Sequence, residues 1–89
     1  MASEGTWREH PFLSGTKYRV KKDFSYLETR AVAGSIVIYD SCGYERYDNM
    51  SLFRFYEKSS TFSKRKELIW PLHDDEADSK FDEYFLALS

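Results

Sequence analysis

The chain has 89 residues, of which 42% are hydrophobic and 18% aromatic, and its 13 basic and 15 acidic side chains give a formal net charge of −2. This length fits one domain with a single modest core, and the apolar fraction excludes a disordered chain. The near balance of charge excludes a global field that would attract the whole molecule to nucleic acid or to an anionic membrane.

Three features of the sequence bear on where the protein works. Cys42 is the single cysteine, so it has no intramolecular disulfide partner, and a reducing compartment is the simpler expectation. The first residues lack the apolar core of a secretory signal, and no apolar run is long enough to span a membrane. We therefore expect a cytoplasmic protein that does not insert into membranes.

The first strand is predicted over residues 17–22, where apolar and basic side chains alternate. The alternation places Tyr18 and Val20 on the core face and the basic side chains in solvent. Residues 23–33 show no sustained periodicity and end at Gly34. We interpret them as a long irregular hairpin connection between two strands, with Phe24, Tyr26 or Leu27 folding back on the core.

The central part of the chain carries the strongest strand signal. Two runs of β-branched and aromatic residues flank a segment rich in turn formers and tyrosine, which is typical of paired strands. Ile36 and Ile38 share one face, and we place them in the core together with Phe53 and Phe55. The strands predicted here span residues 35–40, 44–47 and 51–56, with a turn at residues 41–43.

A last strand is predicted over residues 64–72, and Pro71 indicates an edge strand because proline has no N–H to donate. The residues on its apolar face are Leu68, Trp70 and Leu72. The tail then changes to helical spacing, which predicts a helix over residues 76–88 with Asp74 or Asp75 as its N-cap. The apolar stripe of this helix consists of Ala77, Phe81, Tyr84, Phe85 and Leu88.

These elements predict a mainly β (β+α) fold. The expected architecture is a small curled antiparallel sheet, or an SH3-like barrel, of four to five strands with a C-terminal helix. We expect residues 1–11 to form a flexible N-terminal arm and residues 12–89 to form a single domain that includes the helix. Within the arm, only Trp7 is expected to be held against the domain.

Several stretches resemble a small bacterial family that is named only as a domain of unknown function, family 3601. The stretches are Gly15-Thr-Lys-Tyr18-Arg-Val20-Lys-Lys-Asp23-Phe24, Gly34, Tyr47-Asp48-Asn49-Met50-Ser51-Leu52-Phe53, the strand with Trp70, and Tyr84-Phe85. The similarity extends over residues 12–86. It departs from the family pattern at Ser35, where an acidic residue is expected, and at Met50, where glycine is expected. The resemblance implies an SH3-like barrel and no known reaction.

We expect no enzymatic activity, no metal and no cofactor. Cys42 lies in a predicted turn with no nearby histidine or cationic helix end, so nothing indicates a lowered thiol pKa. His73 is followed by several aspartates, but a metal site usually draws ligands from a second segment or from a defined loop spacing. The acidic start of a helix explains these aspartates more simply.

Binding to another protein is the preferred functional hypothesis. Tyrosine and arginine are typical of interface hot spots, and a small barrel cannot direct every tyrosine of the central segment inward. The alternative is that these tyrosines lie flat on the sheet with solvated hydroxyls. The predicted partner-binding residues are Tyr39, Tyr44, Arg46, Tyr47, Arg54 and Tyr56.

A basic strand face that binds nucleic acid is the second hypothesis. It requires the strands that carry the two basic runs to be neighbours, so that their cations form one patch for phosphate groups. The alternative is a solvated strand face whose lysines protect an edge. The residues are Lys17, Arg19, Lys21, Lys22, Lys64, Arg65 and Lys66. The sequence thus predicts a non-enzymatic protein-binding or regulatory module, monomeric or weakly dimeric, whose partner is not identified.

Overall fold

The computed structural model describes residues 5–58 and 66–88. Seven strands and one short helix are found in this part of the chain. They are β1 (Lys17–Val20), β2 (Phe24–Tyr26), β3 (Thr29–Ala31), β4 (Ile36–Glu45), β5 (Met50–Glu57), β6 (Glu67–His73), α1 (Ser79–Tyr84) and β7 (Phe85–Ala87). None of the described helices is long and apolar enough to cross a membrane.

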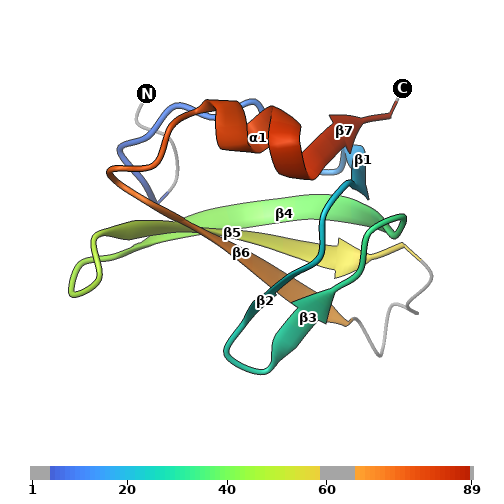
Figure 1. Ribbon diagram of the computed structural model, residues 1–89, viewed down its shortest axis with the longest axis horizontal. Coiled ribbons are helices and arrows are strands. Elements are labelled where there is room, and N and C mark those ends of the chain that lie inside the picture. The colour runs from blue at the N-terminus through green and yellow to red at the C-terminus, as the bar shows by residue number, and fades with distance from the viewer. Residues whose placement is uncertain (1–4, 59–65, 89) are drawn as a thin grey trace.

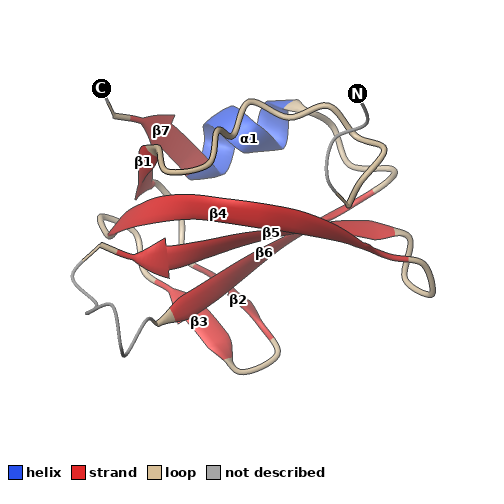
Figure 2. Ribbon diagram, turned by 180° about the vertical axis from the view of Figure 1, so that it is seen from behind, coloured by secondary structure: helices blue, strands red, loops and turns tan. Residues whose placement is uncertain are grey.

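Five of the strands form one antiparallel sheet in the order β6-β5-β4-β1-β7, and β2 pairs only with β3 (Figure 1). The predicted mainly β fold, with an antiparallel sheet and a C-terminal helix, is confirmed. Within the described residues β6 and β7 form the two edges of the sheet and do not pair with each other, so the sheet is open and no closed barrel is formed. Both views show α1 and the N-terminal segment, residues 5–16, on the same side of β4 (Figure 2).

The core is built largely from aromatic rings. Phe12 lies near its centre, with its ring centroid 5.1–5.3 Å from the rings of Tyr39, Phe55 and Phe85. Rings at these separations gain more than their buried area alone provides. The predicted core faces of β1, β5 and β6 are confirmed, since all of their members are buried. These are Tyr18, Val20, Phe53, Phe55, Leu68, Trp70 and Leu72.

The predicted face of the second strand is wrong. Val37 and Tyr39 are buried at 0% and 1% exposure, whereas Ile36 and Ile38 are only partly buried on the other face. The run Ile-Val-Ile-Tyr is apolar on both faces, so alternation alone does not identify the inner one. Cross-strand pairing decides it, because Val37 lies opposite the buried Tyr18 of β1.

The turn predicted at residues 41–43 is also wrong, because β4 continues without interruption from Ile36 to Glu45. The pairing with β5 shifts by one residue between Tyr39 and Ser41. Such a bulge inserts one extra residue, here the exposed Asp40, and bends the strand. As a result Tyr39 and Cys42, three residues apart, both face the core.

Residues 23–33 form an ordered hairpin and not the irregular connection that we predicted. β2 and β3 pair antiparallel, with Phe24 opposite Ala31. Leu27 in the turn adopts a left-handed conformation at φ 53° and is 82% exposed. Phe24 places its ring 5.7 Å from that of Phe85, so the hairpin contributes to the core.

The predicted helix over residues 76–88 is too long. α1 has six residues, begins after Asp78 instead of Asp74 or Asp75, and has no side-chain cap bond. The chain becomes extended at Phe85 because β7 pairs there with β1, where Phe85 lies opposite Val20. This pairing stacks the Phe85 ring on Phe55 at 4.7 Å, so tertiary packing outweighs the helical spacing of the sequence.

Candidate functional site

Residues 5–11 pack against the domain and so differ from the flexible arm that we predicted over residues 1–11, of which residues 1–4 lie outside the described residues. Thr6 and Arg8 are 6% and 4% exposed, whereas Trp7 between them is 62% exposed. The Thr6 hydroxyl shares a buried 2.6 Å hydrogen bond with the hydroxyl of Ser51 on β5. Gly5 has a φ of +86°, and a Cβ at this position would collide with the Cys42 carbonyl oxygen. The segment therefore needs glycine where it meets β4.

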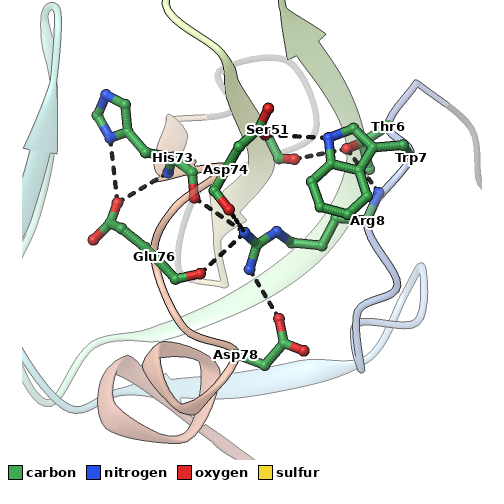
Figure 3. Close-up of polar contacts among 8 residues, drawn as sticks. All are labelled: Thr6, Trp7, Arg8, Ser51, His73, Asp74, Glu76 and Asp78. Carbon is green, nitrogen blue, oxygen red and sulfur yellow. Dashed lines mark hydrogen bonds and ion pairs between the residues drawn. The ribbon is translucent and has the colours of Figure 1, made fainter.

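Arg8 joins this segment to the loop between β6 and α1 (Figure 3). One terminal nitrogen, Nη1, donates to Asp78 Oδ1 at 2.8 Å. The other, Nη2, donates to the backbone carbonyls of His73, Asp74 and Glu76, each at 3.0 Å. A planar guanidinium with several fixed donors suits this task better than an ammonium group. Arg8 therefore holds residues 73–78 in one conformation.

The same loop is closed by a second set of bonds. Glu76 Oε1 accepts the His73 backbone N–H at 2.9 Å and lies 3.2 Å from the His73 ring nitrogen Nδ1. Burial alone would raise the pKa of Glu76, but these hydrogen bonds and the nearby Lys80 outweigh it and lower that pKa. The Glu76 carboxylate is thus a further fixed part of the loop.

Asp74 connects three segments that are distant in the sequence. Its Oδ1 accepts the indole N–H of Trp7 at 3.1 Å, and its Oδ2 accepts the hydroxyl of Tyr44 on β4 at 2.6 Å. The pKa of Tyr44 is raised, first by the hydrogen bond to Asp74 and then by burial and by the charge of Asp74, while Trp7 and Arg46 oppose the rise. The phenol therefore stays protonated and continues to donate to Asp74.

A hollow of about 270 Å³ adjoins this bridge. Its lining residues are Asp48, Asn49, His73, Asp74 and Asp75. The β4–β5 turn is tied to this loop because the Asp74 N–H donates to the Asn49 carbonyl at 2.9 Å. We call Trp7, Tyr44, Asp48, Asp74 and Asp75 together the acidic–aromatic surface.

The chemistry of this surface suits cationic groups of a larger molecule. Within residues 5–58 and 66–88, no three His, Cys, Asp or Glu side chains are grouped so that they could hold a metal ion. Carboxylates next to an exposed indole offer both ion pairing and cation–π contact to ammonium and guanidinium groups. Trp7 already has such a contact, since the Arg8 guanidinium carbon lies 5.3 Å from its ring centroid.

The predicted partner-binding residues do not lie on one surface. Tyr44 belongs to the acidic–aromatic surface, and the exposed Arg46 and Tyr47 lie in the adjoining β4–β5 turn. Arg54 and Tyr56 alternate with buried phenylalanines on β5 and so face the opposite side of the sheet. The remaining member is Tyr39, whose burial in the core corrects its predicted place on a partner-facing surface.

The role of Asp74 was not predicted from the sequence. For Trp7 the sequence predicted only that its side chain is held against the domain. Trp7 and Asp74 are 67 positions apart, and no local pattern connects them. One signal was present, namely a tryptophan in a polar stretch. An indole N–H usually has a hydrogen-bond acceptor, so an acceptor for Trp7 could have been sought elsewhere in the chain. We assigned Asp74 to the helix cap, which is a sufficient local explanation for an acidic residue.

The two basic runs are not on neighbouring strands, so the condition that the nucleic-acid hypothesis requires is not met. β4 and β5 separate β1 from β6, a distance of about 14 Å at the usual strand spacing. Lys66 lies 3.6 Å from the Glu57 carboxylate. Lys64 and Arg65 lie outside the described residues. The single basic patch that the nucleic-acid hypothesis requires is therefore not formed by the described cations.

Lys21 and Lys22 follow β1 and contact α1. Lys21 donates to the Asp82 carbonyl at 2.5 Å, and Lys22 donates to Glu83 Oε2 at 2.7 Å. The hydrogen bond and charge of Glu83 raise the pKa of Lys22, and the same hydrogen bond lowers the pKa of Glu83. These two lysines hold the helix, while Lys17 and Arg19 stay on the exposed face of β1.

A histidine does lie beside the cysteine, contrary to the sequence prediction. His10 Nε2 is 3.8 Å from Cys42 Sγ. The His10 ring is surrounded by aromatic side chains, with its centroid 5.1 Å from that of Phe53. Cys42 itself is 5% exposed. The pair therefore packs against the core and offers a substrate no open approach to the sulfur.

No family model, no curated protein and no solved structure matches the chain. The resemblance to domain family 3601 stays a prediction from its motifs.

Proposed function

We propose that this protein is a non-enzymatic binding module that takes a basic segment of a partner protein on the acidic–aromatic surface. One observation carries the proposal, which is that Trp7 is 62% exposed although its indole N–H is bonded to Asp74. A tryptophan that is both exposed and fixed in orientation is typical of interface hot spots. In the free protein the apolar surface of this indole faces water, and a partner that covers it would remove that surface from water.

The surface is organised before a partner arrives. Trp7 and Tyr44 share the Asp74 carboxylate, and Arg8 fixes the backbone that carries it. Ordering a side chain on binding costs about 0.5–1.5 kcal/mol, and bonds that already hold these groups reduce that cost. The nearby Asp48 and Asp75 add negative charge, which favours encounter with a basic segment.

The finer assignments belong to the same proposal. Five antiparallel strands with a short terminal helix support an SH3-like relationship in which the barrel is open between β6 and β7. Membership of the bacterial domain family 3601, a cytoplasmic setting and action without a cofactor complete the proposed assignment. A fold of this kind specifies no function by itself, so the binding surface carries the functional part.

Tryptophan fluorescence tests the binding surface directly. A short peptide in which arginine and serine alternate is titrated into the protein, and the emission should change saturably and weaken with added salt. Trp7→Phe should remove the change, because the other tryptophan, Trp70, is 3% exposed. Asp74→Asn should weaken binding, while Asp82→Asn on α1 is the matched control. Equal binding of a peptide in which glutamate and serine alternate, or unchanged binding by Asp74→Asn, would contradict the proposal.

A further inference from the structure

The sheet has a second surface that the core does not use. Arg54 and Tyr56 of β5 alternate with the buried Phe53 and Phe55, and the residues paired with them on β4 and β6 face the same way. Seven side chains on this face are each partly buried. They form what we call the outer sheet face, which consists of Ile36, Ile38, Leu52, Arg54, Tyr56, Ile69 and Pro71.

Arg54 occupies the middle of this face. It lies opposite Ser41 of β4 and Ile69 of β6. A Cβ added to Gly43 would lie 2.7 Å from Arg54 Nη2, so the guanidinium lies over β4 in the space that the glycine leaves. Its side-chain bond to Ser41 Oγ is long at 3.4 Å, and within the described residues no carboxylate pairs with it. The guanidinium is therefore placed on an apolar face with donors to spare.

The border of this face carries charges of both signs. The register of β1 against β4 sets Lys17 opposite Ile38 and Arg19 opposite Ile36, so both cations lie on the outer side of the sheet. On the other flank Glu67 of β6 lies opposite Tyr56. Acids also border it, since Asp40 Oδ2 accepts the Ser41 hydroxyl at 3.3 Å and Glu45 lies two positions beyond Gly43 on the same face of β4. Arg54 is thus the central charge on a strip of aliphatic and aromatic side chains whose border carries both signs. A complementary partner has apolar side chains for the strip and a carboxylate for Arg54.

We propose that the outer sheet face docks an acidic amphipathic segment of a partner protein. A carboxylate of the segment pairs with the Arg54 guanidinium, which accepts such groups in a bidentate manner. Apolar side chains of the segment cover the strip on β4, β5 and β6, and further acids face Lys17 and Arg19. Nucleic acid fits this face less well, because phosphate binding needs many cations and gains nothing from an aliphatic strip.

This docking face is independent of the acidic–aromatic surface. The two surfaces lie on opposite sides of the sheet, since Tyr44 pairs with the buried Ser51, which shares its face with Phe53. Their central charges, Arg54 and Asp74, are also of opposite sign and therefore select opposite partners. A failure of one proposal leaves the other standing, because each is tested with a different peptide.

Two-dimensional NMR of the labelled protein tests the docking face. The probe is a peptide in which leucine and glutamate alternate. A peptide in which serine and glutamate alternate measures the effect of charge alone, and a single-stranded oligonucleotide tests nucleic acid as the alternative ligand. We expect saturable shifts in the amides of β4, β5 and β6 and in the Arg54 side-chain N–H, from the leucine–glutamate peptide only. Absent shifts, or shifts on this face from the oligonucleotide instead, overturn the proposal.

Two variants make the test specific to Arg54. Arg54→Gln should weaken peptide binding by on the order of tenfold, the value of one charge-assisted hydrogen bond. Arg30→Gln, an exposed cation on β3, is the control with the same change of charge. Gly43→Ala retains the guanidinium but displaces it, and should weaken binding while the spectrum stays dispersed. Equal affinities for Arg54→Gln and Arg30→Gln overturn the proposal.

Discussion

Replacing Arg8 with alanine removes the donor that holds the N-terminal segment to the β6–α1 loop. Three backbone carbonyls and the Asp78 carboxylate lose their partner. A hydrogen bond to a charged group contributes about 1.5–3 kcal/mol, so the three carbonyl bonds together set an upper range of about 4.5–9 kcal/mol. Water reaches the freed carbonyls in this surface loop, and we expect a net loss of about 3–4 kcal/mol.

Urea unfolding followed by circular dichroism measures this loss. For a domain of this size, about 3–4 kcal/mol corresponds to a melting temperature lowered by about 12–30 °C. Asp78→Ala is the matched control and should cost less than about 1 kcal/mol, because exposed ion pairs contribute little and the Asp78 side chain is 78% exposed. The reasoning is refuted if Arg8→Ala stays within about 1 kcal/mol of wild type or if Asp78→Ala costs as much.

Three further predictions concern the segment and the core. Asp74→Asn should lower the pKa of Tyr44 toward its ordinary value of about 10, as NMR titration of the ring would show. In the wild type, the stability linked to this raised pKa is fully present below pH 10, the ordinary value, and is lost as the pH rises through the pKa of the folded protein. A Tyr44 pKa that Asp74→Asn leaves unchanged would contradict the role of Asp74. Phe12→Ala should cost about 3–5 kcal/mol in urea unfolding, and a loss below about 1 kcal/mol would show that Phe12 does not centre the core. Gly5→Ala should cost about 1–2 kcal/mol through its positive φ and its collision with Cys42, and hydrogen exchange should then reach the amides of the N-terminal segment.

The sequence was sufficient where one face of an element was clearly apolar. On β5 the charged Arg54 stands between Phe53 and Phe55, and on β6 the charged Glu67 precedes Leu68, so a charged residue marked the outer face and the burial of these side chains was predictable. Neighbouring β4 lacks this contrast. Its two faces are both apolar near Ile36, and the choice between them depends on the pairing with β1, which alternation does not contain.

The end of the chain shows a different limit. Phe81 and Phe85 lie four positions apart, which is helical spacing, and both are buried. Phe81 reaches the core from α1, whereas Phe85 reaches it from β7. The helix ends because Phe85 gains a strand partner in β1, and a short helix is too weak by itself to resist that competition.

The candidate site was predictable only in part. Tyr44 was identified from its place in a tyrosine-rich segment, and the structure sets it beside Trp7 and Asp74. The bonds that assemble this group connect residues 30 and 67 positions apart. Local composition carries no information on such separations. Arg8, which fixes the loop, was not distinguished in the sequence from the other arginines, although it is buried.

The most direct test of the central claim follows the indole N–H resonance of Trp7 while the arginine–serine peptide is added. The account predicts that this resonance shifts saturably and that the indole resonance of Trp70, which is buried, does not. It predicts the same selectivity for the amides around Asp74. A peptide that binds and moves other resonances while the Trp7 indole stays in place would contradict the account.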